Sequence, residues 1–196
     1  MNATANSSNS SFTPLVDHLL IAMPQLQDSY FANTVVYIWR HDPGEGALGL
    51  VVNLPIRMQL WEVLDQLKLD DRRPRAASQI VLSGGPVETA KGFVLHDDKP
   101  RWPSSLAITE SLTLTASRDI LADIGTNSGP ERFIVALGYA SWSPGQLERE
   151  LRDNTWFTCR AQSDIIFSTD FARKPEMAAA TLGFSMSQLA TDVGYS

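Results

Sequence analysis

Three histidines carry the most versatile chemistry in this chain, because imidazole can serve as a general base, a proton donor or a metal ligand. They are His18, His41 and His96, and each lies near the end of a strand-like run. Three imidazoles with one open position would suit a zinc ion. The chain has no His-Glu-x-x-His or His-x-His motif, so a structural role for each histidine is the better interpretation. We expect no metal and no cofactor, and keep a metal-dependent or histidine-using enzyme as an alternative.

Serine and carboxylate chemistry finds little support in the residue spacing. A serine nucleophile needs a histidine partner or a strained Gly-x-Ser-x-Gly elbow. Ser83, Ser117 and Ser141 lie near glycines, but none stands in that motif. Glu148 and Glu150 are two residues apart in a predicted helix, so they would not share a face as an acid–base pair. The residues leave enzyme activity open and favour a protein without chemistry of its own.

One segment, Gly44–Gly49, spells the Gly-x-Gly-x-x-Gly pattern of dinucleotide-binding folds. That chemistry requires a helix to follow, so that its first amides meet the pyrophosphate. Here the next residues are the β-like run Leu50-Val51-Val52-Asn53. The pattern therefore predicts a turn between strands at 34–39 and 49–53, and not a nucleotide site.

Two glycine-rich segments with aromatic residues remain as candidates for binding. Gly84 and Gly85 follow a strand, where paired glycines permit close approach of a ligand or form a tight turn. Tyr139 and Trp142 flank a turn, where they could stack on a ligand or fill the junction with the next helix. In both segments the purely structural role is the simpler interpretation.

Size, charge and cysteine content exclude several classes of protein. With 196 residues, the chain fits one domain over residues 15–196, preceded by a disordered Ser/Asn/Thr-rich tail over 1–14. A net charge of −6 makes direct nucleic-acid binding unlikely. No apolar run approaches the ~20 residues of a membrane helix. The single cysteine, Cys159, cannot form an intrachain disulfide and is compatible with a cytoplasmic location.

Periodicity predicts more strands than helices. Amphipathic spacing and caps indicate helices at 59–68, at 117–125 with Ser117 as its cap, from Pro144 with Ser143 as its cap, and at 175–182. Apolar runs bounded by Gly, Pro and Asp predict strands at 19–22, 34–39, 49–53, 79–83, 92–96, 107–109, 112–116, 133–137, 156–160 and 164–167. Strands that come in runs favour an α+β fold, with mostly antiparallel or mixed sheets and about four helices.

Several of these pieces together resemble the AlgH/YqgE family of bacterial proteins. The opening stretch from His18 to Pro24, the two glycine-rich segments and Ser117-Arg118-Asp119 carry the resemblance, which extends over residues 17–184. Further matching pieces are Asp28, the run 35–41, Gly46 to Asn53 with Pro55, and the stretch 153–156. Lys91 stands where the family usually has arginine, and Ser141 where many members have glycine. The resemblance implies coiled, partly bifurcated sheets. The family has no settled activity, so a fold is implied and not a reaction.

Polar, glycine and aromatic residues at predicted strand ends define the candidate site, because loops on a rigid sheet commonly carry function. The candidate residues are Asn53, Gly84, Gly85, His96, Ser117, Arg118, Tyr139 and Trp142. In this cleft Arg118 would hold an anionic group of a small molecule. We expect a binding or regulatory module that acts on an unknown small molecule or protein partner. Indirect control of transcription, through a protein, is the remaining alternative.

Overall fold

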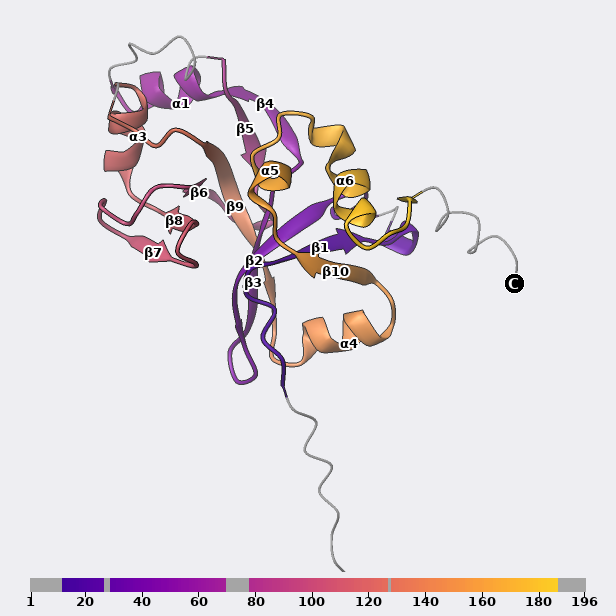
Figure 1. Cartoon of the computed structure of the whole chain (residues 1–196). Helices are drawn as coiled ribbons and strands as arrows, with labels where there is room; N and C mark the ends of the chain where they lie inside the picture. Colours follow the sequence, from indigo (N-terminus) through magenta and orange to yellow (C-terminus); the bar gives the residue numbers. More distant parts are fainter. Residues whose placement is uncertain (1–11, 27–28, 70–77, 127, 187–196) are drawn as a thin grey trace, which may run out of the picture.

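The computed structural model describes residues 12–26, 29–69, 78–126 and 128–186, and its strands form one strongly curled, branched sheet (Figure 1). The predicted tail lies outside these residues, apart from 12–14. The strands are β1 (His18–Ala22), β2 (Val35–Asp42), β3 (Gly46–Val51), β4 (Pro55–Gln59), β5 (Ile80–Ser83), β6 (Val87–His96), β7 (Ser105–Ala107), β8 (Thr113–Thr115), β9 (Phe133–Trp142) and β10 (Trp156–Arg160). The α-helices are α1 (Leu60–Gln66), α3 (Arg118–Ile124), α4 (Gln146–Arg152), α5 (Ser163–Ile166) and α6 (Lys174–Ala180), with 3₁₀ turns η1 (Pro24–Leu26) and η2 (Phe171–Arg173).

Strand β9 holds the two halves of the sheet together. Along the main path the order is β10-β1-β2-β3-β9-β6-β8-β7, and β5 branches off to join β4 to β9. The first half of β9 lies between β5 and β6, and its second half pairs with β3. All pairings are antiparallel except β5 with β9. The predicted α+β class is confirmed, and β9 is the strand at which the sheet divides.

The division of the sheet requires glycine at one position in β9. Gly138 has φ +74°, a left-handed conformation that costs energy for residues with a Cβ. Opposite it, β6 leaves the ladder between Val87, which pairs with Tyr139, and Gly92, which pairs with Leu137. A bulge of this kind bends a strand and increases its twist. Gly138 therefore marks the place where β9 passes from one half of the sheet to the other.

The predicted turn between two strands is confirmed, although it is shorter than expected because β2 extends to Asp42 and β3 begins at Gly46. Strand β2 pairs with β3 in an antiparallel hairpin, with Asp42 opposite Gly46. The Asp42 carboxylate accepts from the amides of Gly44 (2.8 Å) and Glu45 (3.1 Å), which fixes the turn. No helix follows the last glycine, so no helical amides are offered to a phosphate there.

One strand prediction and one helix prediction need correction. Residues 164–167 were predicted as a strand, but 164–166 lie in the one-turn helix α5 and Phe167 is its C-cap, because the short apolar run carries no period that separates the two structures. Helix α4 begins at Gln146 and not at Pro144, because Gly145 adopts a left-handed conformation with φ +72°. The Gln146 side chain still accepts from the Ser143 amide (3.0 Å). Ser117 caps α3 as predicted, accepting from the Asp119 amide (3.0 Å).

Strand β4, which was not predicted, supplies one wall of a pocket described below. It starts with Pro55 and alternates exposed and half-buried residues over only five positions. Two further strands, β7 and β8, cover 105–107 and 113–115, so the predictions at 107–109 and 112–116 were displaced or long by a few residues. The ends of such short strands depend on the neighbouring turns, and the residues of these turns give little sequence signal.

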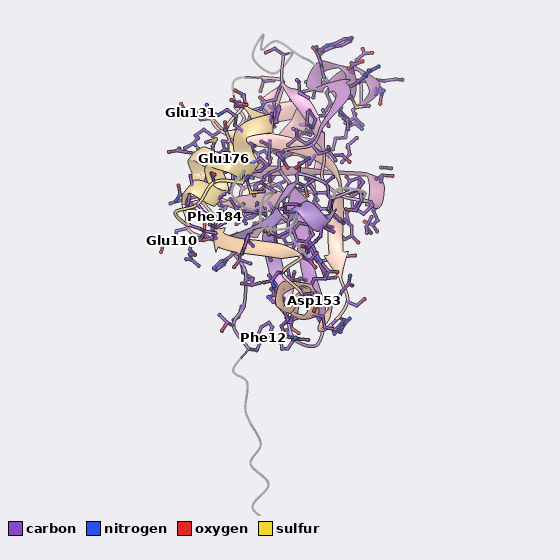
Figure 2. All side chains as sticks on the ribbon, turned by 90° about the vertical axis from the view of Figure 1, so that its right-hand side faces the viewer. Phe12, Glu110, Glu131, Asp153, Glu176 and Phe184 are labelled. Carbon is purple, nitrogen blue, oxygen red and sulfur yellow. The ribbon has the colours of Figure 1, made fainter. Side chains whose placement is uncertain are left out.

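Each group of helices covers a different part of the sheet. Helices α1 and α3 lie together at one end, α5 and α6 cover another face, and α4 lies at the opposite end (Figure 1). Three apolar clusters follow this division, with Leu64 and Ile120 in the first, Ile166 and Ala178 in the second, and Leu147 in the third. Figure 2 shows Glu131, Glu176 and Phe184 on the face of α5 and α6, with Phe12 and Asp153 towards the other end. No helix in the described part of the chain is long and apolar enough to cross a membrane.

Candidate functional site

Of the eight candidate residues, Ser117 and Arg118 line a common pocket, which we call the Arg118 pocket. Its volume is ≈ 430 Å³. It lies between α1, the start of α3 and the sheet formed by β6 and β9. The apolar part of its wall includes Met58, Val63, Leu67, Leu121, Val135 and Leu137. A mostly apolar cavity with a few polar groups is the usual form of a small-molecule site.

Arg118 supplies the positive charge of this pocket. Its side chain is largely exposed, and the guanidinium donates a hydrogen bond to the carbonyl oxygen of Leu67 at the end of α1. Among the described residues no carboxylate forms an ion pair with Arg118. A guanidinium has five N–H donors in a fork that matches a carboxylate or phosphate. The charge is therefore placed where an anionic group could meet it.

Ser117 contributes less to the pocket than its position suggests. Its hydroxyl accepts from the Asp119 amide and donates to the Asp119 carboxylate, both at 3.0 Å. These bonds satisfy the start of α3 and fix the Ser117 side chain. The residue thus positions Arg118 and the first turn of the helix, with one face of its side chain in the pocket wall.

Gly92 keeps the pocket open on the side of β6. It is exposed, and a Cβ placed on it would lie 3.9 Å from Leu137 Cδ2. That distance is ordinary van der Waals contact. A larger side chain at this position would therefore extend into the pocket without straining the backbone.

Asn53 and His96 are buried away from this pocket and serve the fold. The Asn53 side chain accepts from the Val35 amide (2.7 Å) and donates to the Asn33 carbonyl (2.9 Å). His96 is completely buried, and its Nε2 is 2.9 Å from the Thr115 hydroxyl. Burial lowers the pKa of His96, so the ring is held neutral. Both residues have their hydrogen-bonding groups occupied within the protein.

Gly84 and Gly85 allow a close approach to the backbone of β9, and not to a ligand. A Cβ on Gly84 would overlap the carbonyl oxygen of Gly138, and one on Gly85 would overlap the backbone of Tyr139. The Gly84 amide donates to the Leu137 carbonyl (2.7 Å), which ties the turn to β9. The structure uses the paired glycines to let this turn pass directly against β9.

Tyr139 and Trp142 belong to two separate aromatic clusters. Tyr139 lies edge-on to Trp39 and Phe93, with ring centroids 6.0 and 5.9 Å apart. Trp142 is buried, and its indole N–H donates to the Glu150 carboxylate (2.8 Å). The same carboxylate oxygen accepts from the indole of Trp156 (2.8 Å). The eight candidates therefore do not converge on one cleft.

The three histidines also lie in separate surroundings. His18 Nδ1 is 3.0 Å from the Val16 carbonyl. His41 Nδ1 accepts from the Leu15 amide (3.0 Å), and its Nε2 is 2.9 Å from the Glu148 carboxylate. Within residues 12–26, 29–69, 78–126 and 128–186, no group of three or more His, Cys, Asp or Glu could hold a metal ion.

A buried lysine was not anticipated from the sequence. Lys174, at the start of α6, is completely buried and donates to the carbonyls of Val52 (2.7 Å) and Ile166 (2.6 Å). Burial lowers the pKa of Lys174 to about 7. The Lys174-Pro175 pair at a helix start gave no signal of burial, because lysine at this position normally lies in solvent.

The walls of the Arg118 pocket were likewise absent from the predicted site. They come from partly buried apolar residues of β4, α1 and β9, such as Met58, Val63 and Leu137. In a sequence such residues look like ordinary core positions. Only the packing of α1 and α3, which leaves them incompletely covered, distinguishes them.

Known proteins resemble this chain over nearly its whole length. A family model described as AlgH-like matches residues 19–187. A UPF0301 protein of Shewanella loihica is 46% identical over 182 residues, covering 92% of this chain and 98% of the relative. A UPF0301 protein of Photobacterium profundum is 44% identical over 185 residues, with the same coverage.

Solved structures agree with the fold. The solution structure of the AlgH protein from Pseudomonas aeruginosa matches with a TM-score of 0.73 and 43% identity, covering 95% of this chain and 98% of the other. A crystal structure of a protein from Corynebacterium diphtheriae matches with a TM-score of 0.64 at 17% identity, over 84% of this chain and 87% of the other. At that identity the second likeness concerns the fold alone.

Proposed function

The chain belongs to the AlgH-like family, and we propose that it works as a binding module with its ligand in the Arg118 pocket. The observation that carries the proposal is the combination of an apolar cavity of ≈ 430 Å³ with a guanidinium at its wall. Elsewhere, the polar groups of Asn53, His96 and Trp142 are hydrogen-bonded inside the fold. In the Arg118 pocket two candidate residues, one of them charged, line the same cavity.

The lining of the pocket defines the class of ligand. Leu121, Val135 and Leu137 offer an apolar surface, and Arg118 is the cation in the pocket wall. An apolar molecule that carries one anionic group matches both features, because its body removes apolar surface from water and its charge pairs with the guanidinium. A purely polar anion would leave the apolar wall unused.

Binding can be tested with two probes of this class, 8-anilinonaphthalene-1-sulfonate and decanoate. We expect saturable fluorescence enhancement of the first and a rise in the unfolding midpoint with the second. At a hundredfold over its Kd a ligand adds about 2.7 kcal/mol of stability. For a chain of this size, roughly 2–4 °C of midpoint shift accompanies each kcal/mol.

Two variants test whether the probes bind in the Arg118 pocket. Gly92→Leu fills the pocket and leaves Arg118 intact, while Arg118→Ala removes the cation. Both should abolish the effects of the probes, and Arg152→Ala, an exposed change on α4, should leave them unchanged. Probe binding that survives Gly92→Leu would exclude this pocket. Survival in Arg118→Ala alone would exclude the anchoring role.

A regulatory role goes with this proposal. A module that binds a small molecule can present its bound and free states to a protein partner. Indirect control of transcription through such a partner is part of the same proposal, with a cytoplasmic location and no direct contact to nucleic acid. Neither a metal nor a cofactor enters it.

A further inference from the structure

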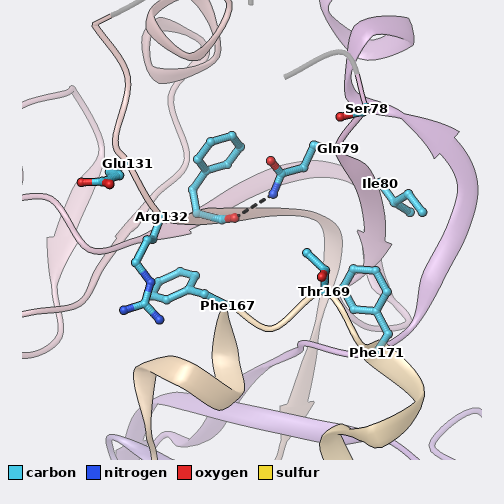
Figure 3. Close-up of a pocket in the computed structure, with 9 residues that line it drawn as sticks. Ser78, Gln79, Ile80, Glu131, Arg132, Phe167, Thr169 and Phe171 are labelled. Atoms are coloured by element: carbon cyan, nitrogen blue, oxygen red, sulfur yellow. Dashed lines mark hydrogen bonds between the residues drawn. The ribbon is translucent and has the colours of Figure 1, made fainter. Parts of the chain in front are cut away.

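A second pocket, of ≈ 340 Å³, lies in the crevice between the starts of β5 and β9, closed on one side by the segment after α5 (Figure 3). We call it the Phe167 pocket. The lining residues used below are Gln79, Ile80, Arg132, Phe133, Phe167, Thr169 and Phe171, and among the described residues Glu131 is the one acidic residue in the lining. None of them lines the Arg118 pocket, so the two sites can be tested independently.

The crevice exists because the parallel pair of strands opens towards its beginning. Strands β5 and β9 pair at Leu82 with Ala136 and at Ser83 with Leu137. Before these residues the Gln79 side chain spans the gap, and its Nε2 donates to the Phe133 carbonyl (3.0 Å). The dashed line in Figure 3 marks this bond. The pocket is thus formed by backbone geometry and braced by a side chain.

A basic side chain lies over each aromatic wall of the pocket. The guanidinium carbon of Arg132 lies 4.9 Å from the Phe167 ring centroid. The Lys174 amine lies 5.1 Å from the Phe171 centroid. The attraction between the Arg132 guanidinium and the face of the Phe167 ring favours this arrangement of the two side chains. In Figure 3 the two rings lie to either side of Thr169, whose hydroxyl is between them.

Arg132 already holds a carboxylate, from the solvent side. Its guanidinium donates to Asp164 (2.9 Å), and the Asp164 side chain is 90% exposed. An exposed ion pair of this kind contributes little stability, because water competes for both charges. A carboxylate on a ligand bound in the pocket can therefore take the place of Asp164 on Arg132.

We propose that the Phe167 pocket binds a small planar aromatic carboxylate. Its ring packs against Phe167 and Phe171, its carboxylate pairs with Arg132, and the Thr169 hydroxyl is within the pocket to hydrogen-bond its polar edge. Offset or edge-on packing suits two aromatic walls, and the guanidinium fork suits a carboxylate.

Indole-3-acetate is a suitable probe, because its aromatic ring and its carboxylate can each be tested alone, as indole and as acetate. In a titration of the ¹⁵N-labelled protein we expect saturable shifts at the amides of Ile80, Phe133 and Thr169. Indole and acetate, each alone, should bind at least roughly tenfold more weakly, because each lacks one of the two contacts. Equal binding of acetate alone would overturn the proposal, since the aromatic walls would then contribute nothing.

Variants of the Arg132–Asp164 ion pair should change the affinity for indole-3-acetate in opposite directions. Arg132→Gln should weaken binding of indole-3-acetate roughly tenfold or more, through loss of a charge-assisted bond. Asp164→Asn should strengthen binding, because the competing carboxylate is gone. A structural role for the pair would not predict an increase. Unchanged affinity in Asp164→Asn, or in Arg132→Gln, would overturn the assignment.

Matched controls locate the effect. Arg160→Gln alters another exposed arginine, with a 72% exposed side chain that pairs with Asp17, and should leave binding unchanged. Gly92→Leu fills the Arg118 pocket and should also leave indole-3-acetate bound. Loss of binding in Gly92→Leu would place the probe in the Arg118 pocket and overturn the proposal for the Phe167 pocket.

Discussion

Gly85 and Gly92 stand seven positions apart in the same glycine-rich stretch, yet the structure uses them in opposite ways. Gly85 is buried with the Tyr139 backbone where a side chain would be. Gly92 is exposed and lines the Arg118 pocket, and a Cβ placed on it would lie 3.9 Å from Leu137 Cδ2. From the sequence alone, both positions look like flexible glycines. The two positions differ in the space that a side chain would enter.

The same contrast separates two groups of residues. Those whose polar groups are satisfied inside the fold form what we call the closed side, and those at the two pockets form the open side. On the closed side, Asn53, His96, Trp142 and Lys174 each donate or accept within the protein. In the described residues no buried side-chain nitrogen or oxygen lacks a hydrogen-bond partner. On the open side, the two pockets expose apolar walls beside an arginine. Polar residues of the closed side are therefore explained by folding, and binding is the role that we propose for the two arginines of the open side.

The largest expected effect is that of Gly85→Ala. The new methyl would overlap the Tyr139 backbone, which cannot move without shifting β9. We expect a loss of more than about 3 kcal/mol in the free energy of unfolding, as for severe overpacking of a core. Urea unfolding followed by tryptophan fluorescence measures it. A loss below about 1 kcal/mol would show that this turn can leave β9, and the contrast with Gly92 would fail.

Glu150→Ala tests a half-buried acceptor of the closed side. One oxygen of Glu150 accepts from the indoles of Trp142 and Trp156, and the other accepts from Gln146. Removal leaves both indole N–H groups without an acceptor, at a cost of about 2–4 kcal/mol. The neighbouring change Arg149→Ala, on an exposed residue, serves as control. Equal stability of the two variants would contradict the role of Glu150.

Lys174→Met tests the buried amine through pH. The pKa of Lys174 is about 7 in the folded protein and about 10.4 in an unfolded chain, so between these values only the unfolded chain binds the proton. The contribution of Lys174 to stability therefore rises with pH from about 7 to about 10, by up to about 1.4 kcal/mol per pH unit. Below pH 7 both states are protonated and the contribution is constant.

The measurement for Lys174 is the difference in unfolding free energy between the wild type and Lys174→Met at pH 7, 8 and 9. Taking the difference removes other titrating groups, such as Cys159, whose pKa is raised by burial. We expect the wild type to gain on the variant with each step. A constant difference over this range would show that the Lys174 pKa is not lowered.

Gly92→Ala should have the smallest effect. The added methyl meets only Leu137 at van der Waals distance, so the free energy of unfolding should change by less than about 0.5 kcal/mol. The same urea titration used for Gly85→Ala measures it. A loss comparable to that of Gly85→Ala would mean that the pocket is closed at this position in solution.

Much of the fold could be predicted from the sequence because apolar runs and caps act locally. The β2–β3 hairpin and the Ser117 cap follow from residues within a few positions of each other. Helix α5 and strand β4 could not be predicted in this way. Their four or five residues adopt their structure through packing against α6 and pairing with β5, which no local pattern contains.

The candidate site was predictable only in part, for a related reason. Arg118 was singled out as a polar residue near a predicted strand end that could hold an anionic group, and it lines a pocket in the structure. Trp142 and His96 were singled out because their types can bind ligands, but whether such a group is satisfied depends on distant partners. Glu150 and Thr115 supply those partners, eight and nineteen residues away.

The central position of β9 has a consequence for synthesis on the ribosome. Strands β3, β5 and β6 are all made before residues 133–142, yet each relies on β9 as a neighbour, and β1 must wait for β10. At about 5–20 residues per second, the early strands spend several seconds with unpaired edges. Exposed strand edges are prone to pair with other chains. The nascent protein thus passes through its most aggregation-prone stage just before β9 emerges.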